Sequence, residues 1–171
     1  MLAIKQSLTA EQRLHRAVVL VMRHPDYVPM QGILSIGSRA VDDKTPTACT
    51  NGRDEWYGRG FIEAHTDPEL RFTVLHENYH KALKHLATYD KLFRINGQLA
   101  NMSCDYVINA KLIQEEQERA KGKADYKPFV VMPSGGLYEP RFLDMSAGEV
   151  FKILQKEQED GKDMSDAGSM D

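Results

Sequence analysis

Residues 76–80 read His-Glu-Asn-Tyr-His, and this run constrains the chain more than any other segment. In a helix, residues four apart lie about 40° apart around the axis, so His76 and His80 project from one face. Two imidazoles placed in this way can bind one metal ion, and Glu77 between them can accept a proton from an attacking water. The pattern HExxH therefore predicts a zinc-dependent hydrolase with Glu77 as general base.

The alternative is a solvent-facing helix in which the two histidines are incidental, because such a helix would show the same five letters. Asp67-Pro68-Glu69 is typical of a helix start, and apolar residues recur at helical spacing as far as about Thr88. The motif thus lies within a predicted helix that has a buried side. We interpret it as a metal site on that ground.

A catalytic zinc ion usually has three protein ligands, and the motif supplies two. His85 is nine residues after His76, which places it on the opposite side of a continuous helix. No glycine occurs between His80 and Asp90 to break that helix. We therefore expect His85 to support a ligand side chain, to be packed or to be exposed, and not to be a ligand itself.

A second predicted helix, residues 99–118, offers a better third ligand. Asn101, Asp105 and Asn109 are spaced by four and form one polar stripe among apolar neighbours. A solvated face of an amphipathic helix is the alternative. We predict that Asp105 binds the metal and that the two asparagines orient the site through hydrogen bonds.

The remaining elements complete an α+β prediction. A first helix begins near Thr9 and ends near His24-Pro25, residues 32–37 are extended, and Ser146–Glu149 starts a last helix through about Glu157. Residues 47–50 form a strand, and the hairpin signal Asn51-Gly52 returns it from Arg53 onward. Residues 61–64 extend this return strand or form another one, which predicts a small antiparallel sheet that packs with the two ligand-bearing helices.

Composition limits the classes of protein that this chain can belong to. With 171 residues and 42% apolar side chains, it suits a single domain, residues 1–158, followed by an acidic tail, 159–171, predicted to be disordered. The net charge of −3 disfavours nucleic-acid binding, and hence also a protease that acts on DNA-bound proteins. Two cysteines without ligand spacing, no secretory signal and no membrane-spanning run predict a cytoplasmic protein.

Three segments resemble a known family: VLHENYHKALKHL, LANMSCDYVINAKLI and YEPRFLDMSAGEVFKIL. The upstream run TNGRDEWYGRGFIEAHTDPELRFTVLHE is similar to its strand-turn-strand lead into the motif. The family is the putative metallopeptidase domain of phages and bacteria, whose bacterial members often carry a von Willebrand A-like region. The resemblance covers about residues 45–155.

The family pattern HExxHxxxxH is met by His76, Glu77, His80 and His85, and its Asp-x-x-(Val/Ile)-Asn pattern by Asp105 and Asn109. The resemblance implies a zincin-like, zinc-dependent peptidase encoded by a phage and active in the host cytoplasm. It also implies a further histidine-containing segment beyond the position of Asp171. Asn78 and Tyr79 depart from the usual apolar pair inside HExxH, which affects packing and not the ligand geometry.

The predicted reaction is hydrolysis of peptide bonds in a protein or peptide substrate. An extended substrate is expected to pair with a sheet edge near residues 61–64. Tyr138 and Arg141, in the loop 128–145, are candidates for polarising the substrate carbonyl, although ordinary loop packing is the simpler interpretation. The alternative function is a catalytically silent zincin-fold binding module, such as a phage protein that sequesters a host factor and keeps the metal for structure.

Overall fold

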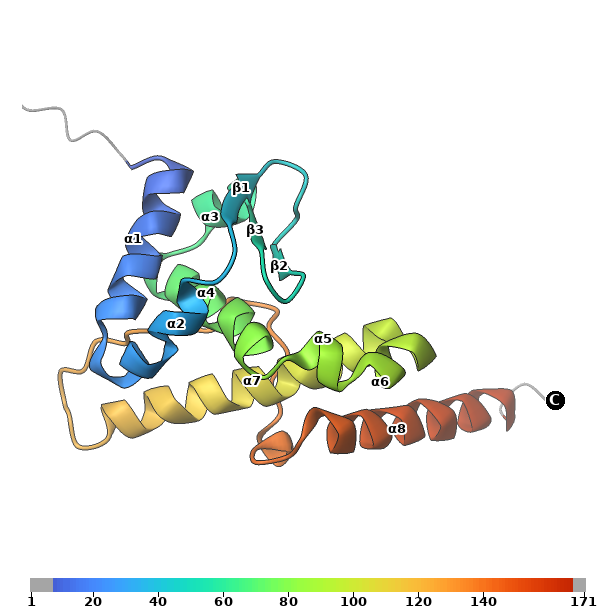
Figure 1. Ribbon diagram of the computed structural model, residues 1–171. Helices are drawn as coiled ribbons and strands as arrows, with labels where there is room; N and C mark the ends of the chain where they lie inside the picture. Colours follow the sequence, from blue (N-terminus) through green and yellow to red (C-terminus); the bar gives the residue numbers. More distant parts are fainter. Residues whose placement is uncertain (1–7, 168–171) are drawn as a thin grey trace, which may run out of the picture.

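The computed structural model describes residues 8–167, and their side chains as far as Asp160. Helices make up most of the chain, and one three-stranded sheet lies at one end (Figure 1), so the α+β class is confirmed. In chain order the elements are α1 (Ala10–Arg23), the 3-10 helix η1 (Pro25–Met30), α2 (Gln31–Leu34), β1 (Arg39–Asp42), β2 (Ala48–Thr50), β3 (Glu55–Gly58), α3 (Arg59–Ala64), α4 (Asp67–Ala82), α5 (His85–Thr88), α6 (Asp90–Ile95), α7 (Gly97–Ala120), the 3-10 helix η2 (Pro140–Phe142) and α8 (Ala147–Ala167).

The sheet is mixed and not antiparallel as predicted. Its order is β1-β3-β2, with β1 parallel to β3 and β2 antiparallel to β3. The Asn51-Gly52 signal predicted the β2–β3 hairpin correctly. It carries no information about β1, which pairs with the other edge of β3 because the loop 43–47 carries the chain past the end of the sheet. Residues 32–37 are also not extended: they form most of α2 and a turn that ends at Gly37, whose φ is +77°.

Residues 61–64 belong to helix α3, so the strand predicted there is wrong. The backbone leaves β3 at Gly58, and α3 begins at the next residue. A side chain at Gly58 would collide with the backbone, because its Cβ would lie 2.1 Å from the carbonyl oxygen of Thr45. Ile62 is buried on this short helix, and Arg13 of α1 donates to its carbonyl at 2.6 Å.

The core is formed mainly by α1, α4 and α7, and it holds α4 between the sheet and α7 (Figure 1). At the start of α4, the carboxylate of Glu69 accepts hydrogen bonds from the backbone N–H and hydroxyl of Thr66, each at 2.7 Å. Thr66 is therefore the capping residue of α4. Asp67, the first residue of the helix, forms ion pairs with Arg13 and Arg16 of α1.

Helix α8 packs along α7 through Leu99, Ala100 and Phe151. Its first turn has the predicted capping box, in which Ser146 and Glu149 exchange hydrogen bonds of 2.8 and 3.3 Å. The helix continues to Ala167, ten residues past the predicted end near Glu157. Residues 155–160 contain no proline that would stop it. Part of the predicted tail thus lies in α8, and residues 168–171 lie outside the described residues. Within residues 8–167, no helix is both long and apolar enough to cross a membrane.

Candidate metal centre

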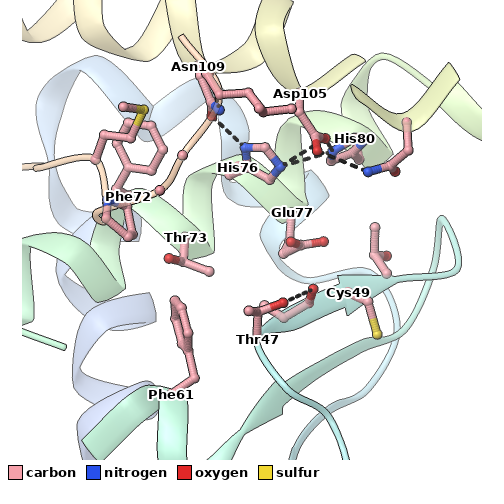
Figure 2. A pocket seen from close by; sticks show the side chains of 18 of the residues that line it. Thr47, Cys49, Phe61, Phe72, Thr73, His76, Glu77, His80, Asp105 and Asn109 are labelled. Carbon is pink, nitrogen blue, oxygen red and sulfur yellow. Dashed lines mark hydrogen bonds and ion pairs between the residues drawn. The ribbon is translucent and has the colours of Figure 1, made fainter. Parts of the chain in front are cut away.

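Helices α4 and α7 bring three potential ligand atoms to one point. His76 and His80 lie one turn apart on α4, and Asp105 faces them from α7 (Figure 2). The two Nε2 atoms are 3.1 Å apart, and Oδ1 of Asp105 lies 3.4 Å from Nε2 of His76 and 3.0 Å from Nε2 of His80. These are the three residues predicted as ligands, and the structure places them together.

Two asparagines of α7 hold members of this cluster. Oδ1 of Asn109 lies 2.8 Å from Nδ1 of His76, and because a side-chain carbonyl can only accept, Nδ1 carries the proton. Nδ2 of Asn101 donates to Oδ2 of Asp105 at 2.9 Å. The predicted polar stripe therefore faces the cluster, and its hydrogen bonds are those expected of orienting residues. Asn109 is buried, whereas Asn101 is exposed.

His85 does not lie across the helix from His76, because the predicted continuous helix is broken. Helix α4 ends at Ala82, Lys84 adopts the left-handed conformation (φ +51°, ψ +41°), and His85 begins α5. The break turns the His85 ring back, so that its Nδ1 lies 3.2 Å from Nδ1 of His80. His85 thus contacts the far side of the His80 ring and not the point where the three ligand atoms meet. The helix therefore breaks at a lysine, although the absence of glycine between His80 and Asp90 had predicted a continuous helix.

The titratable side chains of the cluster shift one another's pKa values. Burial lowers the pKa of His76, but the hydrogen bond to Asp105 and the charges of Glu77 and Asp105 outweigh it and raise that pKa to about 9. Burial raises the pKa of Asp105, and hydrogen bonds from His76 and His80 overcome this and hold it well below its usual range. Burial, with the positive charge of His80, lowers the pKa of His85 to about 4, which keeps His85 neutral near pH 7.

The triangle of ligand atoms fits a small ion in tetrahedral coordination. In a tetrahedral site, zinc–nitrogen and zinc–oxygen bonds of about 2.0–2.2 Å place neighbouring ligand atoms about 3.3–3.6 Å apart. The separation of 3.4 Å lies within that range, and those of 3.0 and 3.1 Å are a few tenths of an ångström shorter, so a small outward shift of the ligand atoms admits the ion. The donor set of two imidazoles and one carboxylate is also one that binds zinc in enzymes. The residues present therefore fit the metal that the motif predicts.

A cavity of about 390 Å³ opens beside the ligand atoms. It lies between α4 and α7 on one side and β2 on the other, and residues 132–137 close a third side. Glu77 is buried, lines this cavity, and extends from α4 toward β2 near Thr47 and Cys49 (Figure 2). Burial raises the pKa of Glu77, and the positive charges of His76 and His80 oppose that rise.

Other residues named from the sequence lie elsewhere. Arg141 forms ion pairs with Glu139 and with Glu157 of α8, and neither Arg141 nor Tyr138 lines the cavity. The simpler interpretation, loop packing, therefore agrees with their positions. Cys49 and Cys104 are free thiols, and Cys104 is buried.

Sequence reasoning missed the buried polar cluster beneath the motif. Glu55 of β3 accepts from Lys81 at 2.6 Å and from Arg39 of β1 at 2.8 and 2.9 Å. Nδ2 of Asn78 donates to Glu55 at 3.3 Å, and the hydroxyl of Tyr79 donates to Glu115 of α7 at 3.2 Å. The two departures from the apolar pair of HExxH therefore have polar partners below α4 and on α7. The sequence indicated these contacts only through the polar side chains of Asn78 and Tyr79.

The fold and the site together define a class: an α+β domain in which an HExxH helix and a second helix share a candidate metal centre. Comparison with known families agrees. A family model described as a putative metallopeptidase domain matches residues 9–170, and the chain belongs to that family. The match confirms the resemblance noted in the sequence and extends it on both sides. No curated protein and no solved structure matches the chain significantly.

Proposed function

We propose that this protein is a zinc-dependent peptidase of the zincin type, with His76, His80 and Asp105 as metal ligands and Glu77 as general base. One observation supports the proposal most strongly: three ligand atoms meet at the wall of a cavity, and a buried carboxylate extends into the same cavity. Zinc bound there would polarise the scissile carbonyl and lower the pKa of the attacking water.

The choice of zinc rests on Glu77 as well as on the ligands. Two histidines and one carboxylate also suit non-haem iron(II). An acidic residue directly after the first histidine, on the helix that carries both, is instead the arrangement of hydrolytic zinc sites. Glu77 has that position, and no hydrogen bond to its carboxylate is found among the side chains that the structure describes. The carboxylate is therefore available to take a proton.

The surrounding residues prepare these groups for their roles. Asn109 accepts the Nδ1 proton of His76, which directs the Nε2 lone pair of His76 to the ion once the Nε2 proton has left. His85, neutral near pH 7, can accept the Nδ1 proton of His80 and direct its Nε2 in the same way. Glu77 then accepts a proton from the attacking water and returns it to the leaving amine.

The substrate is proposed to pair with the outer edge of β2, in place of the edge near residues 61–64. Strand β2 lies at the edge of the sheet and lines the cavity. Thr47 accepts from Gly58 of β3 at 2.7 Å, so the alternation of an antiparallel pair points the backbone N–H and C=O groups of Ala48 and Thr50 outward. An extended peptide can pair with these groups while its backbone passes Glu77.

The proposal is tested with protein purified without a histidine tag. We expect about one zinc ion per chain and cleavage of a mixed peptide library, read by mass spectrometry. Glu77→Gln should keep its zinc and its unfolding temperature and lose about 10²–10⁴-fold of the cleavage rate. Glu118→Gln, an exposed glutamate at the end of α7, is the matched control and should behave as the parent.

Two results would contradict the proposal: a parent protein that takes up no zinc, or a Glu77→Gln variant that cleaves as fast as the parent. A third result would favour the alternative function. If zinc is bound and neither form cleaves any peptide in the library, the result supports a structural role for the metal and a function as a binding module.

A further inference from the structure

The cavity beside the metal centre has an apolar end and a polar end. Phe61, Phe72 and Met132 line one end, whereas His80, Asp105 and Asn101 line the other (Figure 2 labels all but Met132 and Asn101). We infer that the apolar end binds a large aliphatic or aromatic side chain of the substrate, next to the scissile bond, and so determines where the protein cleaves. This inference rests on the function proposed above and names its substrate class.

The position of the apolar end suits the residue beside the scissile bond. Phe72 and Thr73 precede His76 and Glu77 by one turn of α4, which is about 5.4 Å along the helix axis. An extended peptide advances about 3.3 Å per residue. A peptide that runs along α4 with its scissile carbonyl against the metal ligands therefore brings the side chain of an adjacent residue to Phe72.

The chemistry of this end favours apolar side chains over charged ones. No lysine or arginine lines the described cavity, and its two acidic side chains, Glu77 and Asp105, both lie at the metal end. The hydroxyl of Thr73 donates to the carbonyl oxygen of Glu69 at 3.0 Å, so it has no proton left to donate to a substrate. A carboxylate bound between Phe61 and Phe72 would lose its hydration without gaining a donor from Thr73, and an ammonium group would gain only the lone pairs of the Thr73 hydroxyl in exchange for its hydration.

The wall that closes this end is anchored by hydrogen bonds at both of its ends. The N–H of Val131 donates to the carbonyl oxygen of Pro68 at 3.2 Å, and Nδ2 of Asn109 donates to that of Leu137 at 2.9 Å. Both ends of the segment 132–136 are thus tied to helices that carry the metal centre. Met132 packs on Gly136, where a Cβ atom would lie 2.8 Å from Cγ of Met132. A wall held in this way can select among side chains by shape.

Binding of hydroxamate probes tests the inference without requiring turnover. Zinc-loaded parent protein is titrated calorimetrically with dipeptide hydroxamates that differ only in one side chain: leucine, phenylalanine, alanine or aspartate. We expect the leucine and phenylalanine probes to bind about tenfold or more tightly than the alanine probe, and the aspartate probe to bind most weakly. Met132→Asp should reduce the preference for leucine over alanine to less than about threefold.

Val131→Asp is the matched control, because Val131 is the exposed neighbour of Met132 and does not line the cavity. It should keep the tenfold preference. Phe61→Ala, on α3, gives an independent variant if Met132→Asp unfolds, and it should also weaken the leucine probe relative to alanine. Thermal unfolding and zinc content verify that each variant is folded and loaded.

Equal affinity for the leucine and alanine probes would overturn the inference and leave the proposed function intact. A leucine preference that persists in both Met132→Asp and Phe61→Ala would overturn it as well. Zinc-loaded protein that binds none of the probes would contradict the proposed function itself, because a catalytic zinc ion must have a position open to a ligand.

Discussion

Each ligand side chain of the candidate metal centre is held by a second side chain. Asn109 contacts Nδ1 of His76, His85 contacts Nδ1 of His80, and Asn101 donates to Asp105. Glu77, between the two histidines, has no such contact among the described residues. The residues that would bind a metal are thus fixed, and the residue that would move a proton is free.

The assignment of the third ligand separates Asp105 from His85. Asp105→Ala removes an oxygen that lies within 3.4 Å of both Nε2 atoms, so we expect stoichiometric zinc binding to be lost. His85→Ala removes a contact on the far side of the His80 ring, and we expect zinc affinity to fall only about 10–100-fold. Competition with a zinc chelator measures both. An opposite ranking, with His85→Ala the more damaging variant, would show that His85 is the ligand.

The two asparagines of α7 should differ in their effect on zinc affinity. Asn109→Ala removes a buried hydrogen bond to His76 and should weaken zinc binding about 10–100-fold. Asn101 is exposed, and water can replace its hydrogen bond to Asp105. Asn101→Ala should therefore weaken zinc binding less than about threefold. The same chelator competition compares them. Equal losses in the two variants would mean that burial does not determine the contribution of these contacts.

At the scale of elements, the break between α4 and α5 determines where His85 lies. Lys84 is exposed, and its backbone has the left-handed conformation, which glycine adopts without strain and a β-branched residue strongly disfavours.

Lys84→Gly should therefore keep or raise the free energy of unfolding, by up to about 1 kcal/mol. Lys84→Ile should lower it by about 1–2 kcal/mol and weaken zinc binding, because it displaces His85. Urea unfolding measures the free energy of unfolding of both variants, and competition with a zinc chelator measures their zinc affinity. A stable Lys84→Ile variant with normal zinc affinity would argue against the break.

The ion pairs of Glu55 connect the sheet to the motif helix. Its side chain and that of Lys81 are almost fully buried, and Arg39 completes the group from β1. Burial raises the pKa of Glu55, but hydrogen bonds from Arg39, Lys81 and Tyr57 outweigh it and lower that pKa below its ordinary value of 4.5. The folded protein therefore holds Glu55 ionised.

Glu55→Gln should lower the free energy of unfolding at pH 7 by about 3–5 kcal/mol, because it leaves buried Lys81 without its counter-charge. The pKa of Glu55 is lowered on folding, so its contribution is complete above about pH 4.5 and is lost as the pH falls through the folded-state pKa. The difference between parent and variant should shrink accordingly in acid. Asp90→Asn, in an exposed pair with Arg94, is the control and should cost less than about 1 kcal/mol. A pH-independent difference would contradict this account.

Local patterns predicted local structure well and packing poorly. The spacing of four placed His76 with His80 and aligned Asn101, Asp105 and Asn109 on one face, because helical periodicity is a property of consecutive residues. The sheet topology, the left-handed Lys84 and the Glu55 cluster depend on contacts between distant segments. A single sequence carries no direct record of those contacts.

At the scale of the whole molecule, the candidate site is assembled from segments far apart in the chain. Strand β2, helices α4 and α7 and the segment 132–137 all contribute to one cavity. Helix α4 lies at the centre, since it packs on α1, α7 and the sheet. The metal centre therefore lies where the main structural elements meet, and its geometry depends on their packing.

Zinc-edge anomalous diffraction from a crystal of the zinc-loaded protein shows directly which side chains bind the metal. We expect one strong peak per chain, about 2.0–2.2 Å from Nε2 of His76, Nε2 of His80 and a carboxylate oxygen of Asp105. Its remaining coordination position should face Glu77 and the cavity. A peak bound by His85 with Asp105 out of reach, or no peak at this site, would contradict the account.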